Sequence, residues 1–336
     1  MNAPRKIAFR VDESSQVGFG HMSRCRTLAH ALWLAGCEVQ FYCAKISNST
    51  RRELEVSGFH VFLLQTEQEF LDADLSESVV VVDGYQFGPE LGGAMKKRAW
   101  KTVYLDDYRG VNYDCDVLIC NNEGLMRSQL STPEYCKVFL GGRYVLIKPE
   151  VLRAARCLRH GARISKSVML VAGGTNQKAW VIRMLGLLGK LEPRAVIWVL
   201  TGRRLSAVNV QRASGLPLKK LRFFSKQSAT QMIRRYQRAG YLVAPASTVL
   251  LEAFAAGIPA ISGWIAQNQQ TSLNAFEAQG LIANIGDLRV PELRELRAAR
   301  SSVLKSGVKM ARLQEAFIRE SLAGTAEIVQ ELLGEC

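Results

Sequence analysis

The chain has 336 residues, of which 48% are hydrophobic, and it carries 44 Lys and Arg against 30 Asp and Glu. This length predicts about two domains, and the apolar fraction is high enough for two cores, which excludes a disordered chain. No apolar run approaches the roughly 20 residues of a membrane helix, and the N-terminus does not read as a signal peptide, so we expect a cytoplasmic protein. The net charge of +14 favours anionic ligands. Its basic residues are scattered without a nucleic-acid-binding motif, and we expect neither a nucleic acid nor a membrane as partner.

Short apolar segments alternate with helix-like segments through the first half of the chain. We predict helices over 22–35 and 50–57, and strands over 6–11, 38–43, 60–64, 79–82, 101–105 and 117–120. Strands separated by helical crossovers form a parallel sheet, and nearly continuous apolar runs fit strands that are buried on both faces. The first half therefore predicts a doubly wound α/β domain.

The alternation stops over 153–166, a stretch rich in Arg, Ala and His, and then starts again. In the second half we predict a helix over 178–191 and strands over 167–171, 196–200, 221–224, 241–243 and 259–262. The last 45 or so residues are charged and have helical spacing. We therefore predict an α/β protein with two Rossmann-like domains and a cleft between them: an N-terminal domain 1–155, a C-terminal domain 165–290 and a helical extension 291–336.

The first candidate site follows the first predicted strand and runs from Asp12 to His21. Ligands bind at the carboxyl ends of parallel strands, where this loop lies. Gly18 and Gly20 permit close backbone approach, and the loop leads into a helix N-terminus. An imidazole at this place suits proton transfer near neutral pH, so we predict a catalytic role for His21. The glycine pair lacks the third glycine of a dinucleotide fingerprint, and we expect no cofactor.

Two further candidate sites lie in the second half. Gly173, Gly174 and Thr175 follow a strand and precede a helix, where backbone N–H groups can meet a phosphate, although a plain tight turn explains this pair equally well. Ser247 and Thr248 open another helix after a strand, and Glu252 follows one turn later. Hydroxyls and free N–H groups would then point outward together at the helix start, and the Glu252 carboxylate could accept both hydroxyls of a ribose. The alternative interpretation makes Ser247 an ordinary N-cap and Glu252 a surface charge.

The remaining candidates are amides and thiols. Asn268 and Gln269 have side chains that suit hydrogen bonds to sugar hydroxyls. The eight cysteines show neither a CxxC pair nor zinc-ribbon spacing, so we interpret them as free thiols. His21 and Cys25 lie one helical turn apart, but two ligands are too few for a metal site, and we expect no metal.

Taken together, these stretches resemble the GT-B superfamily, and within it the UDP-sugar hydrolases of the pseudaminic acid pathway. The second resemblance covers roughly residues 5–285 and rests most on Asp12 to Arg24, which contains the Ser-Ser-Gln and Gly-Phe-Gly-His elements. Further matching stretches are Val82 to Tyr85, Leu105 to Asp107, Asn121-Asn122, Tyr144 to Ile147, Gly173 to Thr175, Ser247 to Glu252 and Asn268-Gln269. The Ser247 to Glu252 region is shared more widely with UDP-dependent glycosyltransferases of the MurG type.

The resemblance implies an enzyme that hydrolyses UDP-2,4-diacetamido-2,4,6-trideoxy-β-L-altropyranose, or a close diamino sugar, with inversion and without a metal. We expect the enzyme to be a monomer. The resemblance implies that His21 is the general base, and that Asp12 shapes or polarises its loop. It also implies that the diphosphate is bound by Gly173, Gly174, Ser247 and Thr248, and that Glu252 holds the ribose. Groups assigned to the sugar are Tyr85, Asn268 and Gln269.

The chain departs from the family pattern at two positions. Gly84 stands where the family commonly has His, and Asn176 stands where it commonly has Asp. Both changes lie beside assigned site residues, so they put the exact sugar in doubt.

Two other functions stay open. An inverting glycosyltransferase would pass the sugar to an acceptor hydroxyl instead of water, and fold analogy does not separate the two enzymes. The Gly-Phe-Gly-His loop favours the hydrolase, because MurG-type transferases usually have a richer glycine cluster there. The net charge of +14 also allows a nucleotide- or nucleic-acid-binding protein without turnover.

Overall fold

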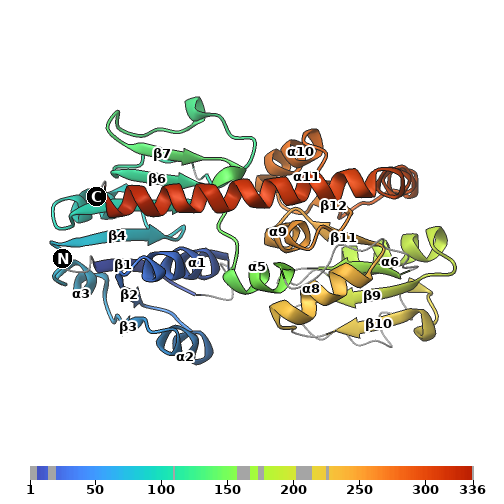
Figure 1. Ribbon diagram of the computed structural model, residues 1–336, viewed down its shortest axis with the longest axis horizontal. Helices are drawn as coiled ribbons and strands as arrows, with labels where there is room; N and C mark the ends of the chain where they lie inside the picture. Colours follow the sequence, from blue (N-terminus) through green and yellow to red (C-terminus); the bar gives the residue numbers. More distant parts are fainter. Residues whose placement is uncertain are drawn as a thin grey trace. The chain divides into compact units, whose positions relative to one another are not determined.

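A computed structural model describes residues 6–13, 20–108, 110–156, 167–172, 178–201, 214–224 and 227–334. The chain divides into two compact units, one made of 1–148 and 320–336, the other of 149–319. We call them unit 1 and unit 2. The division falls a few residues before the predicted boundary at 155, and the last 17 residues return to unit 1 (Figure 1).

Unit 1 is built on a parallel sheet of seven strands in the order β3-β2-β1-β4-β5-β6-β7. Its strands are β1 Lys6–Val11, β2 Glu38–Cys43, β3 His60–Leu63, β4 Ser78–Asp83, β5 Lys101–Asp106, β6 Val117–Cys120 and β7 Lys137–Leu140. Its helices are α1 Gly20–Leu34, α2 Asn48–Val56, α3 Glu67–Leu71 and α4 Pro89–Lys96, with the 3-10 turns Arg127–Gln129 and Gly142–Tyr144. The predicted strands of this half are confirmed, and β7 is additional.

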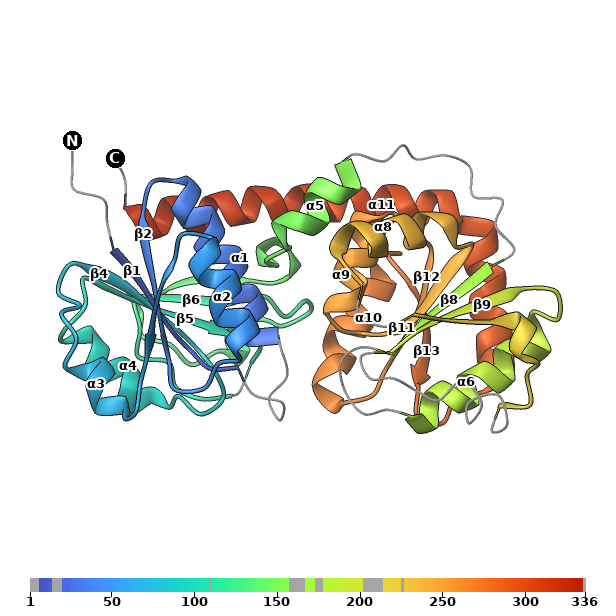
Figure 2. The same cartoon turned by 90° about the horizontal axis from the view of Figure 1, so that it is seen from below.

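Both faces of the unit 1 sheet are covered. Figure 2 shows α1 and α2 on one face and α3 and α4 on the other. Leu28 of α1 packs on the first face together with Ile328 and Leu332 from the end of the chain. Phe70 of α3 and Met95 of α4 pack on the second face. Burial on both faces explains why β4 has a run of four valines, because neither face of the strand meets water.

Unit 2 has a parallel sheet of six strands in the order β10-β9-β8-β11-β12-β13. Its strands are β8 Ser167–Val171, β9 Val196–Leu200, β10 Leu221–Phe224, β11 Tyr241–Pro245, β12 Ala260–Trp264 and β13 Ala283–Asp287. Its helices are α5 Pro149–Arg156, α6 Lys178–Leu191, α8 Ala229–Arg238, α9 Thr248–Ala255 and α10 Gln270–Ala278, with 3-10 turns Leu218–Lys220 and Gln267–Gln269. Leu185 of α6 packs in one core with Leu296 and Met310 of the last helix.

The last helix, α11 Leu293–Leu333, has 41 residues and contributes to both units. Its residues up to Arg319 belong to unit 2, and those from Glu320 belong to unit 1. In unit 1, Ser321 Oγ donates to the Gly142 carbonyl at 3.1 Å, and Lys101 Nζ donates to Glu331 Oε1 at 2.9 Å. The described part of the chain contains no helix that is long and apolar enough to cross a membrane.

Candidate active site

The order of the strands defines one place in each unit where a ligand is expected. In unit 1 the chain leaves β1 toward β2 and β3 on one side and continues at β4 on the other. In unit 2 the same reversal lies between β8 and β11. Doubly wound sheets bind their ligands at the carboxyl ends of the two strands that flank such a point. His21 follows β1, and Ser247 follows β11, so both predicted sites lie at these reversals.

His21 is held by a carboxylate from the strand next to its own. Its Nδ1 lies 2.6 Å from Oδ1 of Asp83, the last residue of β4. Only 5% of His21 and none of Asp83 are exposed. The register pairs Val11 with Asp83, so the ends of β1 and β4 are level and the helix after β1 begins beside the carboxylate.

Arg24 compensates the charge of Asp83. Arg24 lies one turn after His21 on α1. The Arg24 Nε donates to Asp83 Oδ2 at 2.6 Å, and the Arg24 Nη2 donates to Asp83 Oδ1 at 2.5 Å. Cys25 Sγ also donates to Oδ2, at 3.3 Å. Burial alone would raise the pKa of Asp83, but the Arg24 charge and the hydrogen bonds from Arg24 and His21 outweigh it and lower that pKa to about 2. Asp83 is therefore a carboxylate at any physiological pH.

The ionised state of Asp83 assigns the tautomer of His21. A carboxylate only accepts hydrogen bonds, so Nδ1 of His21 carries the proton that Asp83 Oδ1 accepts. Arg24 Nη2 lies 3.0 Å from the same Nδ1, but two donors do not bond to each other, and both of them donate to Oδ1. In the neutral ring the lone pair then lies on Nε2. This is the arrangement of a general base whose ring is oriented by a carboxylate.

Tyr85 packs against the His21 ring from the loop after β4. The two rings are perpendicular, with centroids 4.6 Å apart. The Tyr85 hydroxyl donates to Asp107 Oδ2 at 2.7 Å, and Asn122 Nδ2 donates to the Asp107 carbonyl at 3.2 Å. Burial and the negative charge of Asp107 raise the pKa of Tyr85 above its ordinary value, so its hydroxyl keeps its proton. The loops that follow β4, β5 and β6 thus meet beside His21.

Gly84 connects Asp83 to Tyr85 in a conformation that favours glycine. Its φ is +155°, and a Cβ built there would lie 2.7 Å from Gln86 Oε1 and 2.9 Å from Phe87 Cε2. The histidine that the resemblance places at this position does not fit this backbone, because L-residues rarely adopt that φ. The departure at Gly84 is thus tied to the shape of the loop that carries Tyr85.

Asp12 holds the neighbouring loops in place. Its Oδ1 accepts from the Ala44 and Lys45 N–H groups at 2.7 and 3.0 Å, and its Oδ2 accepts from Gln86 Nε2 at 3.1 Å. Arg10, with 2% of its surface exposed, donates to the same carboxylate at 3.0 Å. Among the described residues no hydrogen bond joins Asp12 to His21, so Asp12 shapes the surroundings of the base and does not contact it.

In unit 2, the described site residues gather around the start of α9. Ser247 is the N-cap of that helix, but its side chain makes no capping hydrogen bond. Thr248 is exposed and Glu252 half-buried on the first turns. After β12, Asn268 is exposed, whereas Gln269 Oε1 accepts the Ile265 N–H at 2.9 Å and so braces its own turn. Gly18, Gly173, Gly174, Thr175 and Asn176 lie outside the described residues, and Gly20 is exposed at the start of α1.

Three residues of this site were given no role from sequence: Asp83, Arg24 and Asp107. Asp83 ends β4, a fully buried strand with four consecutive valines, and an acid at the carboxyl end of a buried strand is the signal that points to it. Arg24 and Asp107 carry no comparable signal, since their roles depend on which strands are neighbours. Among the described residues, no His, Cys, Asp and Glu side chains group in a way that could hold a metal ion.

The chain matches no family model. It is 27% identical over 157 residues to the UDP-2,4-diacetamido-2,4,6-trideoxy-β-L-altropyranose hydrolase of Campylobacter jejuni, a match that covers 45% of this chain and 55% of that protein. The match thus spans only about half of the relative.

Solved structures share the fold over nearly the whole chain. The MurG structure from Acinetobacter baumannii has a TM-score of 0.64 at 13% identity and covers 98% of this chain and 99% of its own. The Anabaena protein Alr3699/HepE, in complex with UDP and glucose, has a TM-score of 0.60 at 13% identity, with 98% and 100% covered. The protein therefore has the GT-B fold, as the sequence predicts.

Proposed function

We propose that the protein hydrolyses a UDP-linked sugar with inversion at the anomeric carbon, and that His21 is the general base. The observation that carries the proposal is the 2.6 Å contact between His21 Nδ1 and the buried Asp83 carboxylate. The partial likeness to the Campylobacter jejuni hydrolase supports water as the acceptor. It also supports UDP-2,4-diacetamido-2,4,6-trideoxy-β-L-altropyranose, or a close diamino sugar, as the substrate.

In this reaction His21 Nε2 takes a proton from a water molecule as the water oxygen attacks the anomeric carbon. The bond between that carbon and the diphosphate oxygen breaks, and UDP leaves with the electron pair. The imidazolium that forms is stabilised by Asp83, which stays ionised because Arg24 balances its charge. Tyr85 limits the positions of the His21 ring and contributes to the sugar site.

The start of α9 is the group we assign to the nucleotide. The first turn of a helix presents N–H groups that are not bonded within the helix, and these favour an anion. Ser247 makes no capping hydrogen bond and Thr248 is exposed, so their hydroxyls suit a diphosphate. In the proposal these donors stabilise the leaving group without a metal, Glu252 accepts the ribose hydroxyls and Asn268 contacts the sugar.

The test is to incubate the protein with this UDP-sugar in ¹⁸O-labelled water and to follow the products by proton NMR and mass spectrometry. We expect free sugar of inverted configuration with ¹⁸O at the anomeric carbon, and unlabelled UDP. Label in UDP would mean cleavage at phosphorus and would overturn the mechanism. His21→Asn should abolish turnover, whereas His30→Asn, further along the same helix, should leave it unchanged.

An inverting glycosyltransferase is the second candidate, because the fold that the chain shares with MurG does not separate transfer to a hydroxyl from hydrolysis. It uses the same base, which then removes the proton from an acceptor hydroxyl. The labelling experiment separates the two functions. A transferase given no acceptor should bind UDP but release little free sugar, and turnover should appear only when a hydroxyl acceptor is added.

A further inference from the structure

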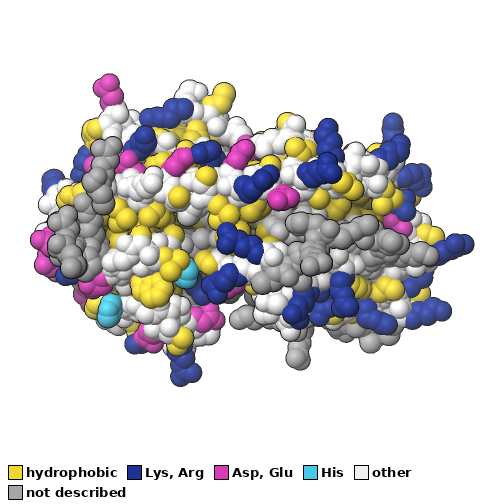
Figure 3. All heavy atoms as spheres, in the orientation of Figure 1, with side chains coloured by type: hydrophobic (Ala, Val, Ile, Leu, Met, Phe, Trp, Pro, Cys, Tyr) yellow, Lys and Arg dark blue, Asp and Glu magenta, His cyan; other side chains and the backbone are white. Residues whose placement is uncertain are grey.

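The net positive charge of the protein comes entirely from unit 2. Unit 2, residues 149–319, contains 27 Lys and Arg and 8 Asp and Glu, a net charge of +19. Unit 1, with 17 Lys and Arg and 22 Asp and Glu, has a net charge of −5. A bound UDP group needs only a few positive charges, so this excess exceeds what the proposed reaction requires. Figure 3 shows Lys and Arg over the visible surface of unit 2 with few acidic side chains between them.

One part of this surface combines cations with exposed aliphatic side chains. On successive turns of α11, Lys305, Lys309 and Arg312 are exposed beside Leu304 and Val308. Leu304 is 57% exposed and Val308 is 73% exposed. We call these five residues the α11 patch. The opposite side of the helix is packed, since Val303 and Met310 belong to the core of unit 2.

Within the part of unit 2 that the structure describes, the three cations of the α11 patch form no ion pair. In contrast, Arg300, earlier on the same helix, pairs with Glu192. Unpaired cations at the surface of a unit with a charge of +19 produce a field that attracts anions over about 8 Å at physiological salt.

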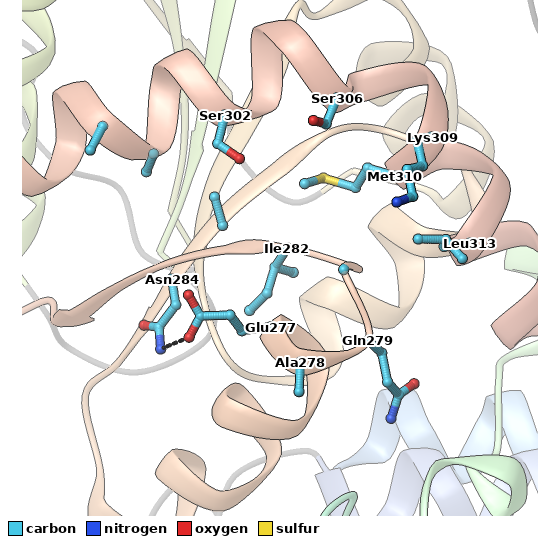
Figure 4. A pocket seen from close by; sticks show the side chains of 14 residues that line it. Glu277, Ala278, Gln279, Ile282, Asn284, Ser302, Ser306, Lys309, Met310 and Leu313 are labelled. Atoms are coloured by element: carbon cyan, nitrogen blue, oxygen red, sulfur yellow. Dashed lines mark hydrogen bonds between the residues drawn. The ribbon is translucent and has the colours of Figure 1, made fainter.

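A cavity borders the patch and adds hydrogen-bond donors. Its volume is about 530 Å³, and it lies between α11, the end of α10 and the start of β13 (Figure 4). Ser302, Ser306 and Lys309 line its α11 side. On the other wall Glu277 accepts a hydrogen bond from Asn284 Nδ2 at 2.9 Å. The two hydroxyls and the ammonium group suit a phosphate of head-group size.

We propose that the α11 patch docks on the surface of an anionic phospholipid bilayer, with Leu304 and Val308 inserted between the head groups. The cations complement the charge of the lipid phosphates, and aliphatic side chains gain free energy at the head-group boundary. Nucleic acid fits less well, because the patch has no aromatic side chain on which a base could stack. This peripheral contact departs from the expectation, drawn from sequence, that no membrane is a partner. It is independent of the proposed enzymatic function.

The test is sedimentation of the full chain with vesicles in about 0.15 M salt. We expect binding to phosphatidylcholine mixed with phosphatidylglycerol in a three-to-one ratio, and none to phosphatidylcholine alone. At about fivefold in affinity for each cation near the surface, the triple variant Lys305→Gln, Lys309→Gln, Arg312→Gln should bind about 100-fold more weakly. The double variant Leu304→Ser, Val308→Ser keeps every charge and should bind several-fold more weakly.

A matched control removes three exposed cations from unit 1: Arg52→Gln, Lys97→Gln, Arg98→Gln. It has the same net charge as the triple variant and should bind vesicles as the natural chain does. An equal loss in this control would overturn the proposal, because attraction would then follow net charge and not the patch. Unchanged binding of the Ser double variant would also overturn it. So would patch-dependent binding to single-stranded RNA without binding to anionic vesicles.

Discussion

The Tyr85 hydroxyl donates to Asp107 Oδ2 at 2.7 Å while the Tyr85 ring stands perpendicular to His21, with centroids 4.6 Å apart. The hydrogen bond fixes the far end of the tyrosine, and the ring then limits the positions open to the imidazole. Asp107 lies directly after β5, so the orientation of the base depends on two strands besides its own.

Tyr85→Phe keeps the ring and removes this hydrogen bond. Hydrogen bonds to charged groups contribute about 1.5–3 kcal/mol, and only part of this free energy bears on the orientation of His21, so we expect a fall in kcat of about tenfold with little change in KM. Tyr85→Ala also removes the packing and should lower kcat further. Steady-state kinetics of the two variants provide the measurement. If they lose equal activity, the ring does not orient His21.

Asp83→Asn keeps the size of the side chain but removes its charge. The amide can present its NH₂ group to Nδ1 of His21, which moves the imidazole proton to Nε2 and leaves no base there. We expect kcat to fall by about 10²- to 10⁴-fold with UDP binding unchanged. UDP affinity by calorimetry, measured beside kcat, separates this result from unfolding, since an unfolded variant loses both.

Arg24→Gln leaves the Asp83 carboxylate buried without its cation. Breaking a buried pair in this way costs about 3–5 kcal/mol of the free energy of unfolding at neutral pH. In the natural chain the pKa of Asp83 is lowered to about 2. The ionised Asp83 therefore adds to the free energy of unfolding at pH values above its pKa in the unfolded chain, near 4, and this stabilisation is lost as the pH falls toward 2. Without Arg24 that pKa rises, and the deficit should shrink as the pH is lowered from 7 to 4.5.

Urea denaturation at several pH values measures this deficit. Arg26→Gln is the matched control, because Arg26 lies on the same helix but forms an exposed pair with Glu53 at 2.8 Å. We expect it to cost under about 1 kcal/mol at every pH. A deficit of Arg24→Gln that does not change with pH would show that Asp83 is not ionised next to Arg24.

Gly84→Ala should destabilise unit 1. The substitution forces a φ of +155° on a residue with a Cβ that lies within 3 Å of Gln86 and Phe87, for a cost of about 2–5 kcal/mol. Gly36→Ala separates the two causes, since Gly36 has a φ of +90° but no atom within 4 Å of a built Cβ. It should cost only about 1–2 kcal/mol. Thermal unfolding compares them, and equal losses would mean that crowding at Gly84 contributes nothing.

The strands were largely predictable from sequence, because buried parallel strands have apolar runs that turn residues separate. β7 and β13 were not predicted. The four residues of β7 lie at a sheet edge, and β13 is a short segment with a glycine and two polar residues, so neither has the pattern of a buried strand.

The place of His21 just after β1 was predictable, because it is a local property of the chain, whereas its catalytic role stays a prediction. Asp83 was not, since its role depends on β4 lying beside β1, and 62 residues separate it from His21. Gly84 was recognised only as a departure from a pattern. The structural reason for a glycine at this position is its φ angle, which cannot be read from the sequence. The end of α11 was predicted as helix, but not that its apolar side chains enter the core of the first unit.

That last arrangement has a consequence for biosynthesis. Ile328 and Leu332 have no exposed surface, and they pack in one cluster with Leu28 and Phe41. Leu28 and Phe41 are synthesised some 300 residues before Ile328 and Leu332. The sheet of unit 1 is therefore made long before the end of α11 can cover its face. During elongation its open face is a binding site for chaperones and a risk of aggregation. Unit 1 can therefore bury its full apolar core only after the final turns of α11 have been synthesised and have reached the sheet.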